Sequence, residues 1–207
     1  MIECNQGDRG GIEMKVAIFE VCRNPEIEKQ TETLMLSEFC KRSGIECEVY
    51  SNDGIWTKRT FLNRSLFQNC LSDTDTKVVH LALHGDRDGL VMRWSNAEKI
   101  RDRRPQERLS PQDIESIVQW RDKVVVSGAY SAAKLSDAFL KAGVAAAVFP
   151  EHPISYQHLV PFLEIFYGKL ATGLSVRNAL NAGLSKFPDL KSFKIFSRRS
   201  PDTLVVA

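Results

Sequence analysis

The chain has 207 residues, 43% of them hydrophobic, and its 28 Lys and Arg against 26 Asp and Glu give a formal net charge of +2. A chain of this length can bury a core in one domain without a metal or disulfide. The balanced charge argues against a nucleic-acid domain held by a strong positive field and against an acidic disordered chain. The sequence has no apolar run of membrane-spanning length and no basic-then-apolar secretory start, so we expect a cytoplasmic protein.

In chain order, residues 1–14 include three glycines and are expected to form a disordered leader, with residues 15–207 as one domain. Apolar runs of strand length then alternate with segments of helical periodicity. The predicted strands are 16–21, 46–50, 77–83, 123–127 and 145–149. The predicted helices are 25–42, 57–70, 111–120, 135–142, 156–170 and 175–186.

Smaller features lie between and after these elements. Thr57 is predicted to cap the second helix, and Ser110 with Asp113 forms a capping-box pattern before the third. Residues 90–94 read as a short return strand and residues 203–206 as an edge strand. Residues 96–108 are basic and polar, but no aromatic residues are interleaved among them, which favours a solvated loop over a phosphate-backbone contact.

The five cysteines indicate reduced thiols. They are odd in number, show no CxxC spacing and lie in the first third of the chain, which fits neither a disulfide framework nor a zinc site. Cys22, Cys40 and Cys70 stand in apolar stretches, where burial as small hydrophobic side chains is the usual outcome. We expect no metal and no cofactor.

The alternation of strands and helices predicts an α/β fold with a mostly parallel sheet between two helix layers. In such sheets chemistry gathers at the carboxyl ends of the strands. The third predicted strand ends at His84 and Gly85, and the fourth ends at Ser127, just before the helical segment that follows Ala129. Neighbouring strand ends would bring these residues to face one another across a space that fits a peptide carbonyl.

Several blocks in this order resemble the CHAT family of caspase-like cysteine peptidases. They cover residues 77–185, and the strands and helices upstream fit the same three-layer αβα fold. The blocks are 79–85 (VHLALHG), 109–114 (LSPQDI), 124–131 (VVVSGAYS), 138–144 (AFLKAGV), 166–170 (FYGKL), 173–175 (GLS) and 179–180 (AL).

The resemblance implies a His-Cys dyad in which His84 is the general base and Ala129 occupies the nucleophile's position. The backbone N–H groups of Gly85 and residue 129 would form the oxyanion hole. Alanine cannot attack a carbonyl, so we expect the chain as it stands to be inactive as a peptidase. Either a Cys→Ala change was introduced into an active endopeptidase, or the protein is a natural pseudoprotease that binds peptides or scaffolds a complex.

The resemblance also implies a pocket for the residue before the cleaved bond, built here from Arg23, Ser127 and Glu151. Because Arg23 and Glu151 have opposite charges, we expect the pocket to admit an uncharged or apolar residue. Domains of this kind are linked to bacterial defence and regulated cell death. We therefore expect a protein substrate and an activating sensor or scaffold protein, with no membrane or direct nucleic-acid partner.

Three other interpretations are weaker. A metal on His80 and His84 lacks a third ligand at suitable spacing, so His80 is expected to be a packed, hydrogen-bonded residue. A serine nucleophile at Ser127 or Ser131 lacks the G-x-S-x-G pattern. A flavodoxin-like nucleotide domain would need a glycine-rich loop after the first strand, where residues 22–25 read CRNP.

Overall fold

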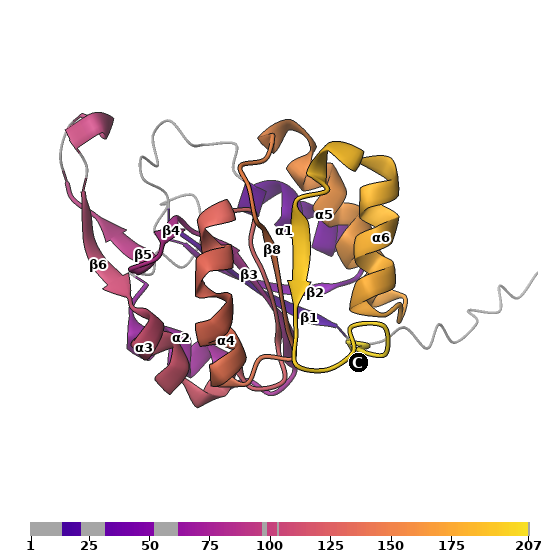
Figure 1. Cartoon of the computed structure of the whole chain (residues 1–207), viewed down its shortest axis with the longest axis horizontal. Coiled ribbons are helices and arrows are strands. Elements are labelled where there is room, and N and C mark those ends of the chain that lie inside the picture. Colours follow the sequence, from indigo (N-terminus) through magenta and orange to yellow (C-terminus); the bar gives the residue numbers. More distant parts are fainter. Residues whose placement is uncertain (1–13, 22–31, 52–61, 97–98, 103, 207) are drawn as a thin grey trace, which may run out of the picture.

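The computed structural model describes residues 14–21, 32–51, 62–96, 99–102 and 104–206. Their centre is a six-stranded sheet with helices on both faces (Figure 1). The strand order is β2 (Glu46–Ser51), β1 (Lys15–Glu20), β3 (Thr76–Ala82), β7 (Val124–Val126), β8 (Ala146–Pro150) and β9 (Phe193–Phe196). The first five are parallel and β9 pairs antiparallel with β8, which confirms the predicted three-layer α/β architecture.

Each face of the sheet has its own apolar cluster, because side chains on a strand alternate between the two faces. One cluster joins the sheet to α1 (Glu32–Arg42), α5 (Tyr156–Ala171) and α6 (Val176–Lys186). The other joins it to α2 (Arg64–Leu71), α3 (Pro111–Ser116) and α4 (Ser136–Ala142). The two sets of helices lie on opposite sides of the sheet in Figure 1.

A second, antiparallel sheet follows β3. It contains β4 (Gly85–Asp86), β5 (Gly89–Trp94) and β6 (Pro105–Leu109), and it projects away from the central sheet in Figure 1. The return strand was predicted, but β6 and the 3₁₀ turn η1 (Ile100–Asp102) lie in the stretch predicted to be a loop, so that prediction is wrong. β6 is polar except for buried Leu109, and its pairing with β5 rather than an apolar pattern makes it a strand.

The C-terminal part also departs from the prediction. The edge strand is β9, whereas residues 203–206 contribute one isolated bridge between Val205 and Ser175. β9 closes the edge of β8, with Phe193 buried in the core on the α5 side. The third helix ends at Ser116, and a 3₁₀ turn, η2 (Val118–Trp120), completes the predicted segment.

The structure also bears on two predictions for the N-terminal part of the chain. The cap of α2 is Asn63, whose side chain accepts the Leu66 N–H at 2.9 Å, and not Thr57, which lies outside the described residues. Residues 1–13 of the expected leader also lie outside them, but Met14 is buried in the core. Cys40 is buried, and Cys47 and Cys70 are partly buried; Cys4 and Cys22 are not among the described residues.

Across the described ranges, every helix is too short or too polar to cross a membrane.

Candidate active site

The two strands that lead to His84 and Ala129 are neighbours in the sheet. β3 and β7 pair in parallel, with Val78 opposite Val124 and His80 opposite Val126. Their carboxyl ends therefore lie at the same edge. The segments that follow also meet, since β4 packs against the 3₁₀ helix η3 (Tyr130–Leu135) that begins directly after Ala129.

His84 leaves the end of β3 with an exposed side chain. Its imidazole meets the Trp94 ring of β5 edge to face, with ring centroids 5.5 Å apart. Its backbone carbonyl accepts the Val91 N–H at 2.8 Å, which fixes the turn from the central sheet into the second sheet. Gly85 follows where space is limited, because a Cβ there would lie 3.3 Å from Leu90 Cδ2.

Ala129 is partly buried and packs against the apolar cluster on the α2, α3 and α4 face. Trp94, whose ring contacts His84, also packs against this cluster. Ala129 has extended backbone angles and stands at the start of η3, which continues into α4. A helix was predicted to begin just after position 129. The structure has the 3₁₀ helix η3 there, and the α-helix α4 follows it.

Ser127 ties this strand end to its neighbour. Its side chain is 1% exposed, its hydroxyl donates to the Leu81 carbonyl at 2.7 Å, and its Oγ accepts the Ala129 N–H at 3.2 Å. The hydroxyl is thus engaged within the protein, which removes support for Ser127 as a nucleophile or as a pocket surface. The Ala129 amide, expected in the oxyanion hole, points to Ser127 in this structure.

A buried polar chain lies beneath this edge. His80 is fully buried, as expected, with Nδ1 2.6 Å from the Tyr167 hydroxyl. Its Nε2 lies 2.9 Å from Oε1 of Glu32, although the direction is not that of a hydrogen bond. Burial, and then the Glu32 charge, raise the pKa of Tyr167 well above its ordinary value, so the phenol stays a donor.

The sequence did not indicate Glu32 and Tyr167, because no local sequence pattern links residues of two helices that lie so far apart in the chain. Glu32 also approaches the site itself, since a Cβ added at Gly128 would lie 3.3 Å from Glu32 Oε1 and 2.5 Å from Leu159 Cδ2. Only glycine fits this position without a shift.

The expected specificity residues are not assembled as a group. Arg23 lies outside the described residues. Glu151 is exposed just after β8, next to β7 in the sheet, and its backbone N–H donates to the Ser192 carbonyl at 2.9 Å. Of the three predicted pocket residues, Glu151 alone has a described side chain open to solvent.

The site gives no support to the metal interpretation. His80 faces Tyr167 and Glu32 on the α5 side, whereas His84 contacts Trp94 of the second sheet. The described part of the chain has no group of three or more His, Cys, Asp or Glu side chains placed to hold a metal ion.

Comparison with known proteins finds only distant structural resemblance among the matches considered. The sequence matches no known protein family and no curated protein. The structure resembles pyridoxal kinase from Staphylococcus aureus in complex with AMP-PCP, with 12% identity, 84% of this chain and 86% of that chain covered, and a TM-score of 0.41. A second structure, of that kinase with AMP-PCP and pyridoxal, covers the same shares at 12% identity with a TM-score of 0.39.

Proposed function

We propose that this chain has the scaffold of a caspase-like, CHAT-type cysteine endopeptidase in which Ala129 stands at the nucleophile's position. The observation that carries the proposal is the pairing of β3 with β7, which brings the segments containing His84 and Ala129 to one sheet edge. The contact between β4 and η3 supports the same arrangement. The proposal rests on the resemblance for the roles of these residues.

With a cysteine at position 129, His84 would take the thiol proton and the thiolate would attack the peptide carbonyl. The tetrahedral intermediate would collapse as His84 returns the proton to the leaving amine, leaving an acyl-enzyme thioester. Water, deprotonated by His84, would then release the new carboxyl end. Oxyanion binding by the Ala129 amide would require it to leave Ser127 Oγ, with Gly85 as the second donor.

The chain as given has no thiol at position 129, so we expect it to cleave no peptide bond. The methyl of Ala129 leaves the rest of the site in place, which suits an inactivated endopeptidase acting on a protein substrate after activation by a partner. The resemblance suggests a cytoplasmic role in bacterial defence or regulated cell death. A second candidate function, a pseudoprotease that binds peptides at the same edge, is favoured by Ala129 itself.

Thiol reactivity tests the dyad without requiring an activator. We expect Ala129→Cys to introduce a thiol that iodoacetamide alkylates with an apparent pKa below the ordinary value of about 8.5. Adding His84→Ala should return that pKa to the ordinary range. The matched control is Ala133→Cys, on the same 3₁₀ helix and also partly buried. Alkylation at each position is followed by peptide mass spectrometry.

Cleavage is measured in parallel on a peptide library with varied residues before the scissile bond. New termini that depend on both Ala129→Cys and His84 support the endopeptidase. An ordinary thiol pKa that His84→Ala does not change would contradict the dyad. Saturable peptide binding by the unaltered chain, with no cleavage by Ala129→Cys, would favour the pseudoprotease instead.

A further inference from the structure

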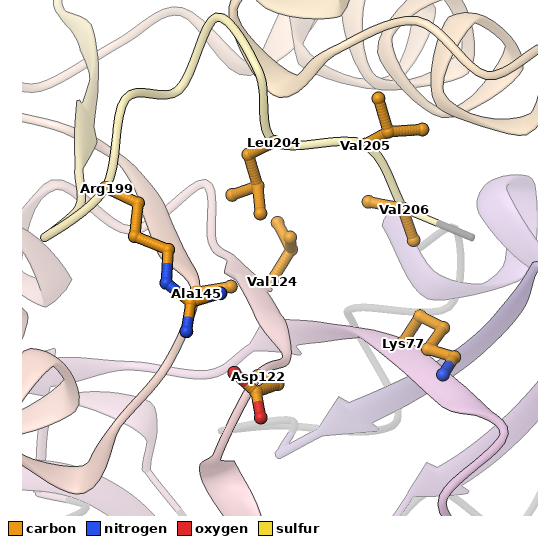
Figure 2. Close-up of a pocket in the computed structure, with 8 residues that line it drawn as sticks. All are labelled: Lys77, Asp122, Val124, Ala145, Arg199, Leu204, Val205 and Val206. Carbon is orange, nitrogen blue, oxygen red and sulfur yellow. The ribbon is translucent and has the colours of Figure 1, made fainter.

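A basic cavity lies at the opposite edge of the sheet, where the parallel strands begin. Its volume is about 480 Å³, and it is bounded by the turn before β7, the end of α4 and the segment after β9. A second cavity of about 250 Å³ continues toward the start of β3 and the C-terminal segment (Figure 2). The two share Asp122, Ala145 and Arg199, so we treat them as one feature, the amino-edge groove.

The amino-edge groove has far more positive than negative side chains. Its cationic residues are Lys77, Arg121, Lys141, Arg198 and Arg199, and its one carboxylate is Asp122. Lys141 is paired with Glu115 at 2.9 Å, whereas within the described chain the other four cations form no ion pair. Since the whole chain carries only +2, this is a local concentration of charge that a bound anion would neutralise.

The backbone around the groove is fixed in shape. Asp122 has a positive φ of 61°, in the left-handed region, and its N–H donates to the Gly143 carbonyl at 3.0 Å. The side-chain stem of Arg121 lies against Gly143, because a Cβ there would be 3.7 Å from Arg121 Cβ and Cγ. These contacts hold the base of Arg121 at the rim of the groove, before any ligand arrives.

Buried Lys123 adds to the positive field at this edge. Its ammonium group donates to the carbonyls of Thr76 at 2.7 Å and Asp73 at 3.0 Å. Burial lowers the pKa of Lys123; the Asp73 charge opposes this and the Lys77 charge contributes to it. The ammonium group of Lys123 is therefore already hydrogen-bonded to neutral carbonyls, and its burial does not depend on a bound ligand.

The smaller half of the groove lies between two cations and has one apolar wall. Figure 2 shows the side chains of Leu204 and Val206 directed from the C-terminal segment into the groove, with Arg199 on one side and Lys77 on the other. Leu204 is only partly buried, so its open part offers a surface on which a flat or apolar group can pack.

We infer that the amino-edge groove binds a small ligand with two or more phosphate groups and an apolar or aromatic portion. The phosphates would lie on Arg121, Arg198 and Arg199, because guanidinium groups match phosphate oxygens in a bidentate way. The apolar portion would lie against Leu204. The volumes fit a small molecule, and the cations are confined to a concavity rather than spread along a stripe as a nucleic acid requires.

The test is calorimetric titration with inorganic pyrophosphate and with ADP, at constant ionic strength. We expect saturable binding of both, tighter for ADP, and about tenfold weaker binding of both by Arg121→Gln and by Arg199→Gln. Leu204→Ala should reduce the advantage of ADP over pyrophosphate. Arg42→Gln is the control, because Arg42 pairs with Glu164 on the α5 side and should leave both affinities unchanged.

Three results would overturn the inference: heats that do not saturate, equal weakening by the control, or tighter binding of a short DNA duplex than of pyrophosphate. Exposed arginines can be replaced without loss of the fold, and circular dichroism confirms this for each variant. None of these measurements depends on a cysteine at position 129, so their outcome is separate from that of the proposed peptidase.

Discussion

The Nδ1 atom of His80 lies 2.6 Å from the hydroxyl of Tyr167, and this contact joins the middle of β3 to α5 inside the core. Both side chains are fully buried. Through Nε2 the same imidazole approaches Glu32 of α1, so one ring connects the sheet with two of the three helices that cover this face. Buried polar groups of this kind are costly when a partner is removed.

We expect Tyr167→Phe to destabilise the protein by about 1–3 kcal/mol, because the hydroxyl is lost while Nδ1 of His80 remains buried. The free energy of unfolding in urea measures this. Tyr156→Phe is the control on the same helix, and since Tyr156 is 65% exposed it should change stability by less than about 0.5 kcal/mol. Equal effects of the two substitutions would contradict the assigned contact.

Two glycines make a matched pair. At Gly128 a Cβ would lie 2.5 Å from Leu159 Cδ2, and Leu159 is buried, so Gly128→Ala should cost about 1–3 kcal/mol. At Gly168, within α5, a Cβ would meet only Phe39 at an ordinary 3.5 Å, so Gly168→Ala should stabilise by about 0.5–1 kcal/mol. Thermal and urea unfolding should therefore shift in opposite directions, and a shift in one direction for both would refute the packing at Gly128.

Ser127→Ala tests how the backbone at position 129 is held. The substitution removes the buried hydroxyl that binds the Leu81 carbonyl and leaves the partly buried Ala129 amide without this partner, at an expected cost of about 1–3 kcal/mol. Combined with Ala129→Cys, it should also alter the alkylation rate of the introduced thiol. Ser131→Ala, at a partly buried position in η3, serves as the control. If stability falls but reactivity stays unchanged, Ser127 has no role in positioning residue 129.

The stability of the folded protein at low pH should depend on the capping box of α3. Hydrogen bonds from the Ser110 hydroxyl, and then from its backbone N–H, lower the pKa of Asp113 below its ordinary value of 3.8. The folded state therefore binds fewer protons than the unfolded state as pH falls through 3.8 and below. The stability from this carboxylate is present above that pH and is lost as pH falls through the folded pKa.

We accordingly expect Asp113→Asn to be less stable than the unaltered chain at pH 6, with the difference shrinking between pH 4 and pH 2. Urea midpoints across this range measure it. Asp75→Asn, whose exposed side chain makes no hydrogen bond within the described residues, should give a difference that is small at every pH. A constant difference for Asp113→Asn would show that its charge does not matter.

The central strands of the parallel sheet could be predicted because they are short apolar runs buried on both faces, such as residues 124–126. The strands that were missed, β4, β6 and β9, are edge strands in antiparallel pairs. β6 reads PQERL and has no apolar pattern, whereas β4 and β9 are only two and four residues long, too short for a periodic pattern. Their positions are set by pairing partners that periodicity does not reveal.

Some features of the candidate site could be predicted from the sequence, and others could not. The adjacency of β3 and β7 follows from topology and was predicted from strand order. The approach of Glu32 to His80 and Gly128 depends on how α1 packs across the sheet, which no local motif specifies. The engagement of the Ala129 amide by Ser127 is likewise a detail of the strand end that residue types alone do not fix.

The antiparallel pairing of β9 with β8 bears on how the chain is made on the ribosome. The backbone edge of β8 emerges first, and its partner is translated only after α5 and α6, a delay of the order of seconds at ordinary elongation rates. Throughout that interval the nascent polypeptide exposes an open, fully apolar strand. Translation pausing or chaperone depletion within this window should therefore favour aggregation far more than the same disturbance after residue 196.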